Sequence, residues 1–187
     1  MKSARVAALL ASLITGCSAD TTVMHQFRQT LASHDSATVA LEQWCARRGI
    51  ADPAHVEALA QDDADRFPAT PAIRSALGIG ADIVVHVRHV RLTCGTSVLS
   101  DARNWYVPAR LTPEMNRTLD TTRTPFGKVV APLGLHRQPL PGGGASPAIC
   151  PAGTIHHETA VLRRDDGIAY SLVSECYTRA NVAPRSA

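Results

Sequence analysis

The residues between Asp82 and Cys94 constrain the fold of this chain more than any other segment. They read DIVVHVRHVRLTC, in which valine and isoleucine alternate partly with histidine and arginine, as in a strand with one buried face. Gly95 interrupts the pattern, and Val98 to Val107 form a second strand-like run. Two such runs joined at a glycine predict an antiparallel hairpin.

Helix signals precede this hairpin. Leu41, Trp44 and Cys45 form an apolar stripe, and Gly49 is placed to close a helix there. An Asp-Pro pair and a Thr-Pro pair each match an N-cap with proline at the first helical position. We therefore expect further helices over residues 55–65 and from Pro71 to Gly78.

The second half of the chain mixes one helix with more strands. Thr112-Pro113 opens a helix to about residue 121, and a turn leads into an apolar strand over 128–133. Residues 138–148 contain Pro-Gly-Gly-Gly and are expected to form a loop, and two final strands are predicted over 154–162 and 168–178. Helices first, then strands with one inserted helix, indicate an α+β domain on an antiparallel sheet.

The N-terminus matches a lipoprotein-type signal peptide. Lys2 and Arg5 precede an apolar stretch over 6–14 that is too short to span a bilayer, and Cys17 follows Thr-Gly. We therefore expect a signal peptide over 1–16, lipidation at Cys17, a tether over 17–35 and a folded domain over 36–180. A plain secretory signal with an incidental cysteine is the alternative.

Charge excludes one class of partner. The chain has 19 basic and 16 acidic residues, and cleavage of the signal would remove Lys2 and Arg5, which leaves the two signs almost balanced. A nucleic-acid-binding protein needs a concentrated basic face, so no nucleic-acid partner is expected. The expected location is the cell envelope, as a periplasmic lipoprotein anchored in the outer membrane, where Ser18 after the cysteine would permit outer-membrane sorting.

Four further cysteines, Cys45, Cys94, Cys150 and Cys176, allow two disulfides with three connectivities in an oxidising compartment. Buried free thiols are the alternative, and the sequence does not select a pairing. No CxxC or Cys/His metal spacing occurs among them. Neither histidine pair, His86 with His89 or His156 with His157, is spaced on a strand to chelate one ion, so no metal site is expected.

An arginine and a carboxylate on separate strands form the candidate site. Arg103 shares a strand face with Asp101 and Trp105, and Glu175 lies on the last strand. An arginine fork can hold a ligand carboxylate, and a buried glutamate can accept from a hydroxyl at the far end of the same ligand. Surface charges or a simple salt bridge would explain the same two residues.

Three motifs resemble the chorismate lyase-like family: RHVRLTCGTSVLSDARNWYVP, TPFGKVV and SLVSECYT. They cover about half of the chain after the signal segment. The resemblance implies a single antiparallel sheet with helices packed on one face. It also implies an elimination of pyruvate from chorismate to give 4-hydroxybenzoate, with no cofactor. Arg103 would bind the ring carboxylate and Glu175 the oxygen-bearing end, and Gly127 would lie in the matching ligand-binding segment.

The motif spacing departs from the family after Arg103. Val98 and Leu99 stand where the family has Pro-Trp, and Pro108 comes one residue late, so Asn104 or Arg110 would be the alternative ligand contacts. Two hypotheses follow. The first is a chorismate pyruvate-lyase-like enzyme. The second is a non-catalytic envelope lipoprotein that uses the same fold to bind a small aromatic carboxylate or a protein partner.

Overall fold

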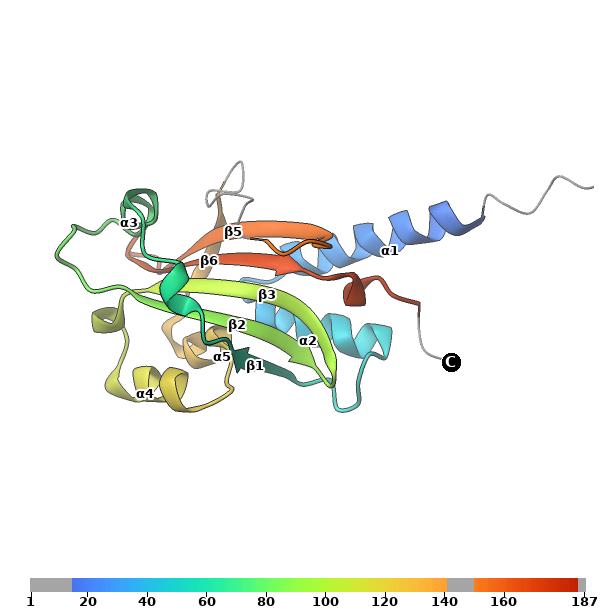
Figure 1. Ribbon diagram of the computed structural model, residues 1–187, viewed down its shortest axis with the longest axis horizontal. Coiled ribbons are helices and arrows are strands. Elements are labelled where there is room, and N and C mark those ends of the chain that lie inside the picture. The colour runs from blue at the N-terminus through green and yellow to red at the C-terminus, as the bar shows by residue number, and fades with distance from the viewer. Residues whose placement is uncertain (1–14, 141–149, 185–187) are drawn as a thin grey trace, which may run out of the picture.

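The computed structural model describes residues 15–140 and 150–184. These residues form five α-helices, one of them only four residues long, and six strands (Figure 1). In chain order the helices and strands are α1 (Thr15–Ala32), α2 (Ala37–Arg48), β1 (Val56–Ala60), α3 (Pro71–Leu77), β2 (His86–Cys94), β3 (Ser97–Tyr106), α4 (Pro113–Thr121), α5 (Phe126–Val129), β4 (His136–Pro139), β5 (His156–Arg163) and β6 (Ala169–Tyr177).

The strands form one sheet in the order β1-β2-β3-β6-β5-β4, and all neighbouring strands are antiparallel. The predicted α+β class with a single antiparallel sheet is therefore confirmed, as is the β2–β3 hairpin. In this hairpin Arg88 pairs with Asn104 and Val90 with Ala102. Ala102 in turn pairs with Glu175 on β6, so these residues project from one face while their strand neighbours project from the other.

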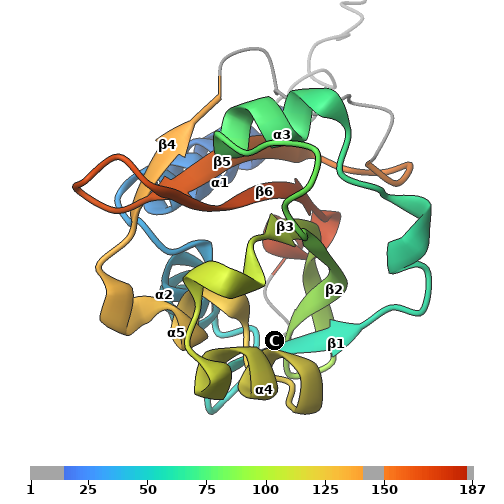
Figure 2. The ribbon, with the colours of Figure 1, turned by 90° about the vertical axis from the view of Figure 1, so that its left-hand side faces the viewer.

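Helices cover the face that carries Ala102 and Glu175. Phe27 of α1 and Trp44 of α2 pack there with Tyr177 in one apolar cluster, and Leu119 of α4 and Phe126 of α5 belong to a second. The short α3 lies against the opposite face, where Ile73 and Leu77 pack with sheet residues that include Trp105, Val161 and Leu172. Figure 2 shows α3 on one side of the strands and α2, α4 and α5 on the other.

The two helices predicted from a Thr-Pro cap, α3 and α4, are confirmed. Thr70 caps α3 and Thr112 caps α4, each accepting a hydrogen bond from the backbone amide three residues on, and α3 ends at Gly78 with a left-handed backbone. The helix predicted over 55–65 is wrong. Val56 and Ala58 are both buried because they alternate along β1, where pairing with β2 overrides the Asp-Pro cap signal.

The strand predicted over 128–133 is also wrong. The segment forms α5 and then a turn of 3₁₀ helix over Ala131–Leu133. In this segment Phe126 and Val130 are buried and the residues between them are not, which is helical rather than strand-like burial. Pro125 precedes it and Pro132 lies within it, and a proline cannot donate to a central strand ladder.

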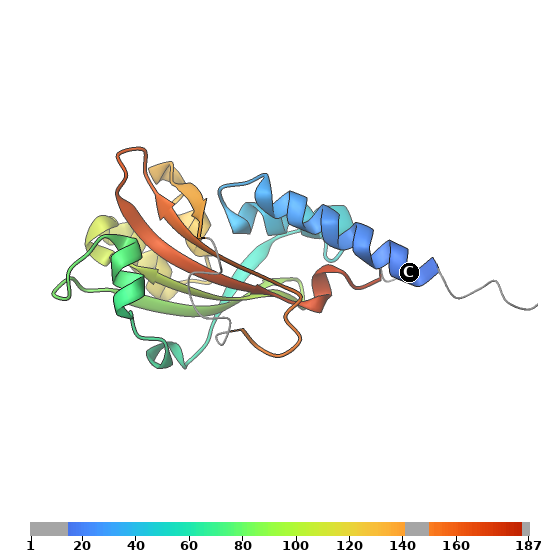
Figure 3. The ribbon, with the colours of Figure 1, turned by 90° about the horizontal axis from the view of Figure 1, so that it is seen from above.

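The tether predicted over 17–35 is replaced by α1, which runs beside α2 (Figure 3). Phe27 and Leu31 lie one turn apart and are both buried, so this helix is part of the core. The predicted signal peptide falls almost entirely outside the described residues. Among the helices that are described, none has the length and apolarity needed to cross a membrane.

The four cysteines form two disulfides, Cys45–Cys94 and Cys150–Cys176. The first ties α2 to the end of β2, and the second ties the segment before β5 to β6. The expectation of disulfides is confirmed, and the tertiary structure selects one of the three connectivities. Trp44 and Trp105 are fully buried, as expected for core residues.

Candidate functional site

A pocket of about 360 Å³ lies between the sheet and the helices on its covered face. Its floor comes from β2, β3, β6, β5 and β4, and its roof comes from the start of α2 and the segment 126–135. The floor is mainly apolar because alternate strand residues are valine, leucine or alanine. Its apolar side chains include Val90, Leu92, Ala102, Val173 and Leu162, and Phe126, Val130 and Leu135 face them from the roof.

Arg88 and Asn104 form one polar end of the floor. They lie directly opposite each other on β2 and β3. The guanidinium of Arg88 donates to the carbonyl oxygens of Thr124 (3.0 Å) and Thr122 (3.2 Å), and within the described chain it forms no ion pair with a carboxylate. Burial lowers the pKa of Arg88, and nearby Tyr106 and Asp120 oppose that shift.

Asn104 is 6% exposed. Its Oδ1 accepts a hydrogen bond from Ser171 at 2.6 Å, while its Nδ2 has no partner among the described residues. A buried amide donor without a partner carries a desolvation cost of about 1–3 kcal/mol. Two donors with unused capacity, one of them charged, therefore lie side by side on the floor.

Arg137 and Glu175 form the second polar end. Arg137 donates to Glu175 at 2.5 Å and to Glu158 at 3.2 Å, and both side chains of the closer pair are less than a tenth exposed. Burial alone would lower the pKa of Arg137, but the charges of Glu175, Tyr177 and Glu158 outweigh it and raise that pKa. The hydroxyl of Tyr177 donates to Glu175 at 3.1 Å, and burial raises the pKa of Tyr177 well above its usual value.

The first turn of α2 closes the roof. Ser36 is its N-cap and accepts a hydrogen bond from the amide of Val39. The backbone amides of a first helical turn carry a partial positive charge, which favours an anion nearby. Gly127 packs against this turn so closely that a Cβ there would lie 2.5 Å from Oγ of Ser36.

The structure brings together three of the predicted site residues and separates two. Glu175, Asn104 and Gly127 line the pocket. Arg110 instead donates to the carbonyl oxygens of Leu77 and Ala169, away from the pocket, and fastens α3 to β6.

The geometry expected for Arg103 is also corrected. The backbone of Arg103 borders the pocket, but its side chain leaves the opposite face of the sheet. There it forms an ion pair with Asp101 at 2.6 Å and lies over the ring of Phe67. It cannot share a slot with the carboxylate of Glu175, because Glu175 pairs in register with Ala102, one residue before Arg103, and a one-residue step reverses the face.

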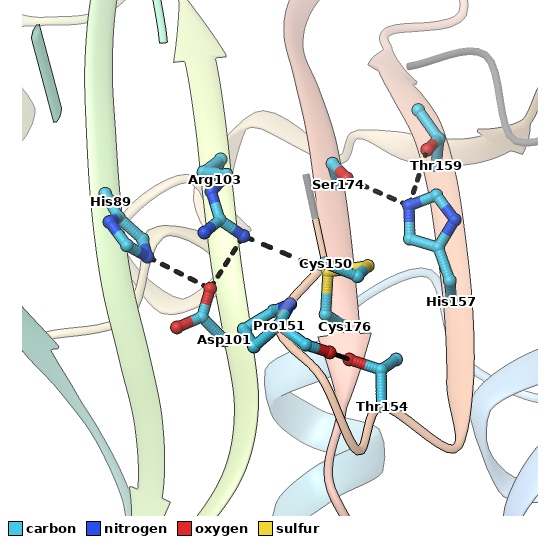
Figure 4. Close-up of a disulfide and its surroundings, with 10 residues drawn as sticks. All are labelled: His89, Asp101, Arg103, Cys150, Pro151, Thr154, His157, Thr159, Ser174 and Cys176. Carbon is cyan, nitrogen blue, oxygen red and sulfur yellow. Dashed lines mark hydrogen bonds and ion pairs between the residues drawn. A yellow bond between two sulfur atoms is a disulfide. The ribbon is translucent and has the colours of Figure 1, made fainter. Parts of the chain in front are cut away.

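Figure 4 shows the opposite face, where His89 and Arg103 both contact Asp101. His89 lies between two carboxylates, contacting Asp101 at 3.0 Å and Asp63 through its other ring nitrogen. Burial would raise the pKa of Asp101, but the hydrogen bond to His89 and the charge of Arg103 lower it overall. These contacts form a structural ion-pair cluster and do not line the pocket.

Sequence reasoning missed Arg88 and Arg137. Arg88 begins the Arg-x-Val-x-Leu run, so the period-two pattern already placed it on the face of Val90 and Leu92. That signal was available. Arg137 lies on the short edge strand β4, whose sequence HRQP has no strand-like pattern.

Among the described residues, one group of possible metal ligands lies outside the pocket. The two sulfur atoms of Cys150 and Cys176 and a ring nitrogen of His157 lie within 4.8 Å of one another. Cysteine binds a metal ion as a thiolate. The two sulfurs of this group are bonded to each other in a disulfide, so neither is a thiolate in this structure.

No protein-family model matches this chain. The chain is 37% identical over 175 residues to the uncharacterized protein y4mC of Sinorhizobium fredii (strain NBRC 101917 / NGR234), an alignment that covers 83% of this chain and 73% of that protein.

Two solved structures overlap the fold partly, each at 15% identity and a TM-score of 0.43. One is the possible transcriptional regulator YydK from Bacillus subtilis, with 71% of this chain and 62% of that chain covered. The other is the ligand-binding domain of a protein described as a GntR-family transcriptional regulator from Bordetella bronchiseptica, with 66% and 84% covered.

Proposed function

This chain belongs to the same family as the Sinorhizobium fredii protein y4mC, and we propose that it binds a small organic acid in the pocket between its sheet and α2. The carboxylate of the ligand would lie against Arg88 and Asn104, and its apolar body would lie on the valine, leucine and alanine side chains of the floor. An aromatic acid is the ligand class that fits best.

The observation that carries this proposal is that Arg88 and Asn104 have hydrogen-bond donors that the described residues leave unused. A half-buried guanidinium with no carboxylate partner among the described residues and a buried amide with an unused Nδ2 donor lie opposite each other on the pocket floor. Both groups would gain a charge-assisted hydrogen bond from a bound carboxylate, the kind that contributes most per bond. The positive end of α2 in the roof adds to the same preference.

The spacing of the polar ends suits a single ring. Glu175 pairs with Ala102 of β3, and Ala102 is two residues from Asn104 on the same face of that strand. Two residues along a strand span roughly 7 Å. A flat acid could therefore present its carboxylate to Arg88 and Asn104 and a hydroxyl to Glu175. The cavity volume is at the small end of the range for ligand pockets, which favours a compact molecule.

Calorimetric titration of the disulfide-bonded protein with 4-hydroxybenzoate and with 4-hydroxybenzamide tests this proposal. The two molecules match in shape and differ in the charge of one group. We expect the acid to bind at least about tenfold more tightly, since it alone offers a charged acceptor. Equal affinity, or binding of the amide alone, would refute the acid-binding role.

A second candidate is the chorismate pyruvate-lyase activity that the sequence motifs imply. Its support is Glu175, a buried carboxylate at the far end of the pocket. Arg137 and Arg88, rather than Arg103, are the arginines that could meet a substrate there. Orientation of the enolpyruvyl ether would supply most of the catalysis, with no cofactor. Incubation with chorismate and detection of 4-hydroxybenzoate and pyruvate tests it, with Glu175→Gln in parallel. Failure of both products to form removes the enzyme proposal and leaves the binding proposal standing.

We also propose that the protein is exported and anchored to a membrane by a lipid on Cys17. Two disulfides are typical of oxidising compartments, and they support a location in the cell envelope. Metabolic labelling with a palmitate analogue, in wild type and Cys17→Ser, tests the lipid anchor. Label in the wild type alone would support it, and label in neither would exclude it.

A further inference from the structure

The Cys150–Cys176 disulfide lies among polar and charged groups on the sheet face opposite the pocket (Figure 4). The sulfur of Cys176, on β6, is buried, and Nη1 of Arg103 donates to it at 3.9 Å. Cys150 is only half-buried. Cys150 is therefore the more exposed residue of the pair, and the sulfur of Cys176 lies beside a positive charge.

The other disulfide provides an internal comparison. Cys45 and Cys94 are both fully buried and belong to the apolar cluster of α1, α2 and β2. No charged side chain among the described residues is recorded in contact with either sulfur. The two disulfides thus differ in the two properties that govern exchange, which are access and stabilisation of the leaving sulfur.

We propose that Cys150–Cys176 is a thiol-exchange site that reacts with small or protein thiols. An external thiolate attacks Sγ of Cys150 and forms a mixed disulfide, while the Cys150–Cys176 bond breaks and Cys176 leaves as a thiolate beside Arg103. A second thiolate of the reductant then displaces Cys150, so a dithiol is oxidised to its disulfide and the protein gains two thiols. This site is independent of the ligand that the pocket takes.

Arg103 is held in place for this role. Asp101 accepts from its Nη1, and Phe67 packs under its guanidinium at 4.5 Å. Its Nε is buried and has no partner within the described residues, so the group keeps donor capacity for a sulfur anion. Asp101 offsets part of the positive charge but is shared with His89 and Arg91.

His157 lies on the other side of the sulfurs and hydrogen-bonds Ser174 at 3.0 Å. Burial and the neighbouring His156 lower the pKa of His157, which disfavours the protonated, positively charged ring, so Arg103 is the cation that meets the leaving thiolate.

The first test uses the wild-type protein with reduced glutathione, followed by acid quenching and peptide mapping by mass spectrometry. We expect the glutathione adduct on Cys150, a free thiol at Cys176, and an intact Cys45–Cys94 bond. An adduct on Cys176, or opening of Cys45–Cys94 first or at an equal rate, would overturn the proposal.

The second test measures the rate of opening by dithiothreitol in Arg103→Gln and Arg103→Lys. We expect Arg103→Gln to slow the opening of Cys150–Cys176 about tenfold, because the leaving thiolate loses its charged donor. Arg103→Lys should keep most of the rate. Arg117→Gln, at an exposed arginine of α4, is the control and should leave the rate unchanged.

If Arg103→Gln fails to fold, the adduct position in the wild type and the rate of Arg103→Lys decide the question. A rate for a folded Arg103→Gln within twofold of wild type would contradict the role of the guanidinium.

Discussion

Arg88 and Asn104 face each other across β2 and β3, and neither has a carboxylate partner within the described chain, although Arg88 is half-buried and Asn104 is buried. Replacement of Arg88 with glutamine should weaken the binding of 4-hydroxybenzoate about tenfold or more, because a charged hydrogen bond is lost. Arg91→Gln is the matched control. It lies three residues along the same strand, its side chain is exposed on the opposite side of the sheet, and the variant should bind like wild type.

Asn104→Asp tests the second donor with almost no change of shape. The substitution replaces a buried donor with a carboxylate, which repels a bound anion. We expect calorimetry to detect no binding of 4-hydroxybenzoate, and near-ultraviolet circular dichroism to show the fold retained. Wild-type affinity in this variant would place the ligand elsewhere.

Gly127→Ala should destabilise the roof of the pocket. The new Cβ would lie 2.5 Å from Oγ of Ser36 and 3.2 Å from Oγ1 of Thr38, so the Ser36 side chain must rotate and release the α2 N-cap. Loss of such a cap costs about 1 kcal/mol. Urea unfolding of Gly127→Ala, Ser36→Ala and the double variant measures this. Fully additive effects would show that the alanine acts through some other contact.

Glu175→Gln should lower the free energy of unfolding by about 3 kcal/mol, since it leaves a buried arginine short of its closest counter-ion. Glu158 remains as a partner for Arg137, so the loss should lie at the low end of the range for a broken buried ion pair. Glu57→Gln is the control, because its ion pair with Arg123 is exposed and should contribute less than about 1 kcal/mol. Equal losses in the two variants would contradict the buried pairing.

Acid should destabilise the fold partly through Glu158. Burial opposes ionisation of Glu158, but the hydrogen bond to His156 and the charge of Arg137 lower its pKa below the ordinary 4.5. The unfolded chain therefore binds this proton at a higher pH than the folded chain does. The stabilisation is present above about pH 4.5 and is lost as the pH falls through the lowered value.

Glu158→Gln should flatten the dependence of unfolding free energy on pH in that window. Glu114→Gln, at an exposed ion pair of α4, should leave the dependence unchanged. An unchanged slope in Glu158→Gln would mean that other carboxylates account for the acid sensitivity.

Phe27→Ala should cost about 3–5 kcal/mol, the usual loss for a fully buried phenylalanine. The ring of Phe27 lies 5.3 Å from those of both Trp44 and Tyr177, so α1 is anchored in the core. Thermal melts of Phe27→Ala and of the exposed control Val39→Ala measure this. A melting temperature unchanged in Phe27→Ala would restore the tether interpretation of this segment.

The sequence by itself determined the parts of the fold that local chemistry specifies. Alternating valines defined the β2–β3 hairpin, Thr-Pro caps defined α3 and α4, and these held because the local preference and the packing agree. Three of the residues that the sequence predicted for the site, Glu175, Asn104 and Gly127, line the pocket. Where packing opposed the local signal, as at the Asp-Pro pair before β1, the tertiary structure prevailed.

The tertiary structure alone decided the disulfide pairing, the inclusion of α1 in the core, and the face on which each charge lies. Arg103 and Glu175 looked like one site because each falls within a motif, but the register of β3 against β6 puts their side chains on opposite faces. A one-residue step along a strand reverses the face, and the register between distant strands depends on long-range packing that no local pattern encodes.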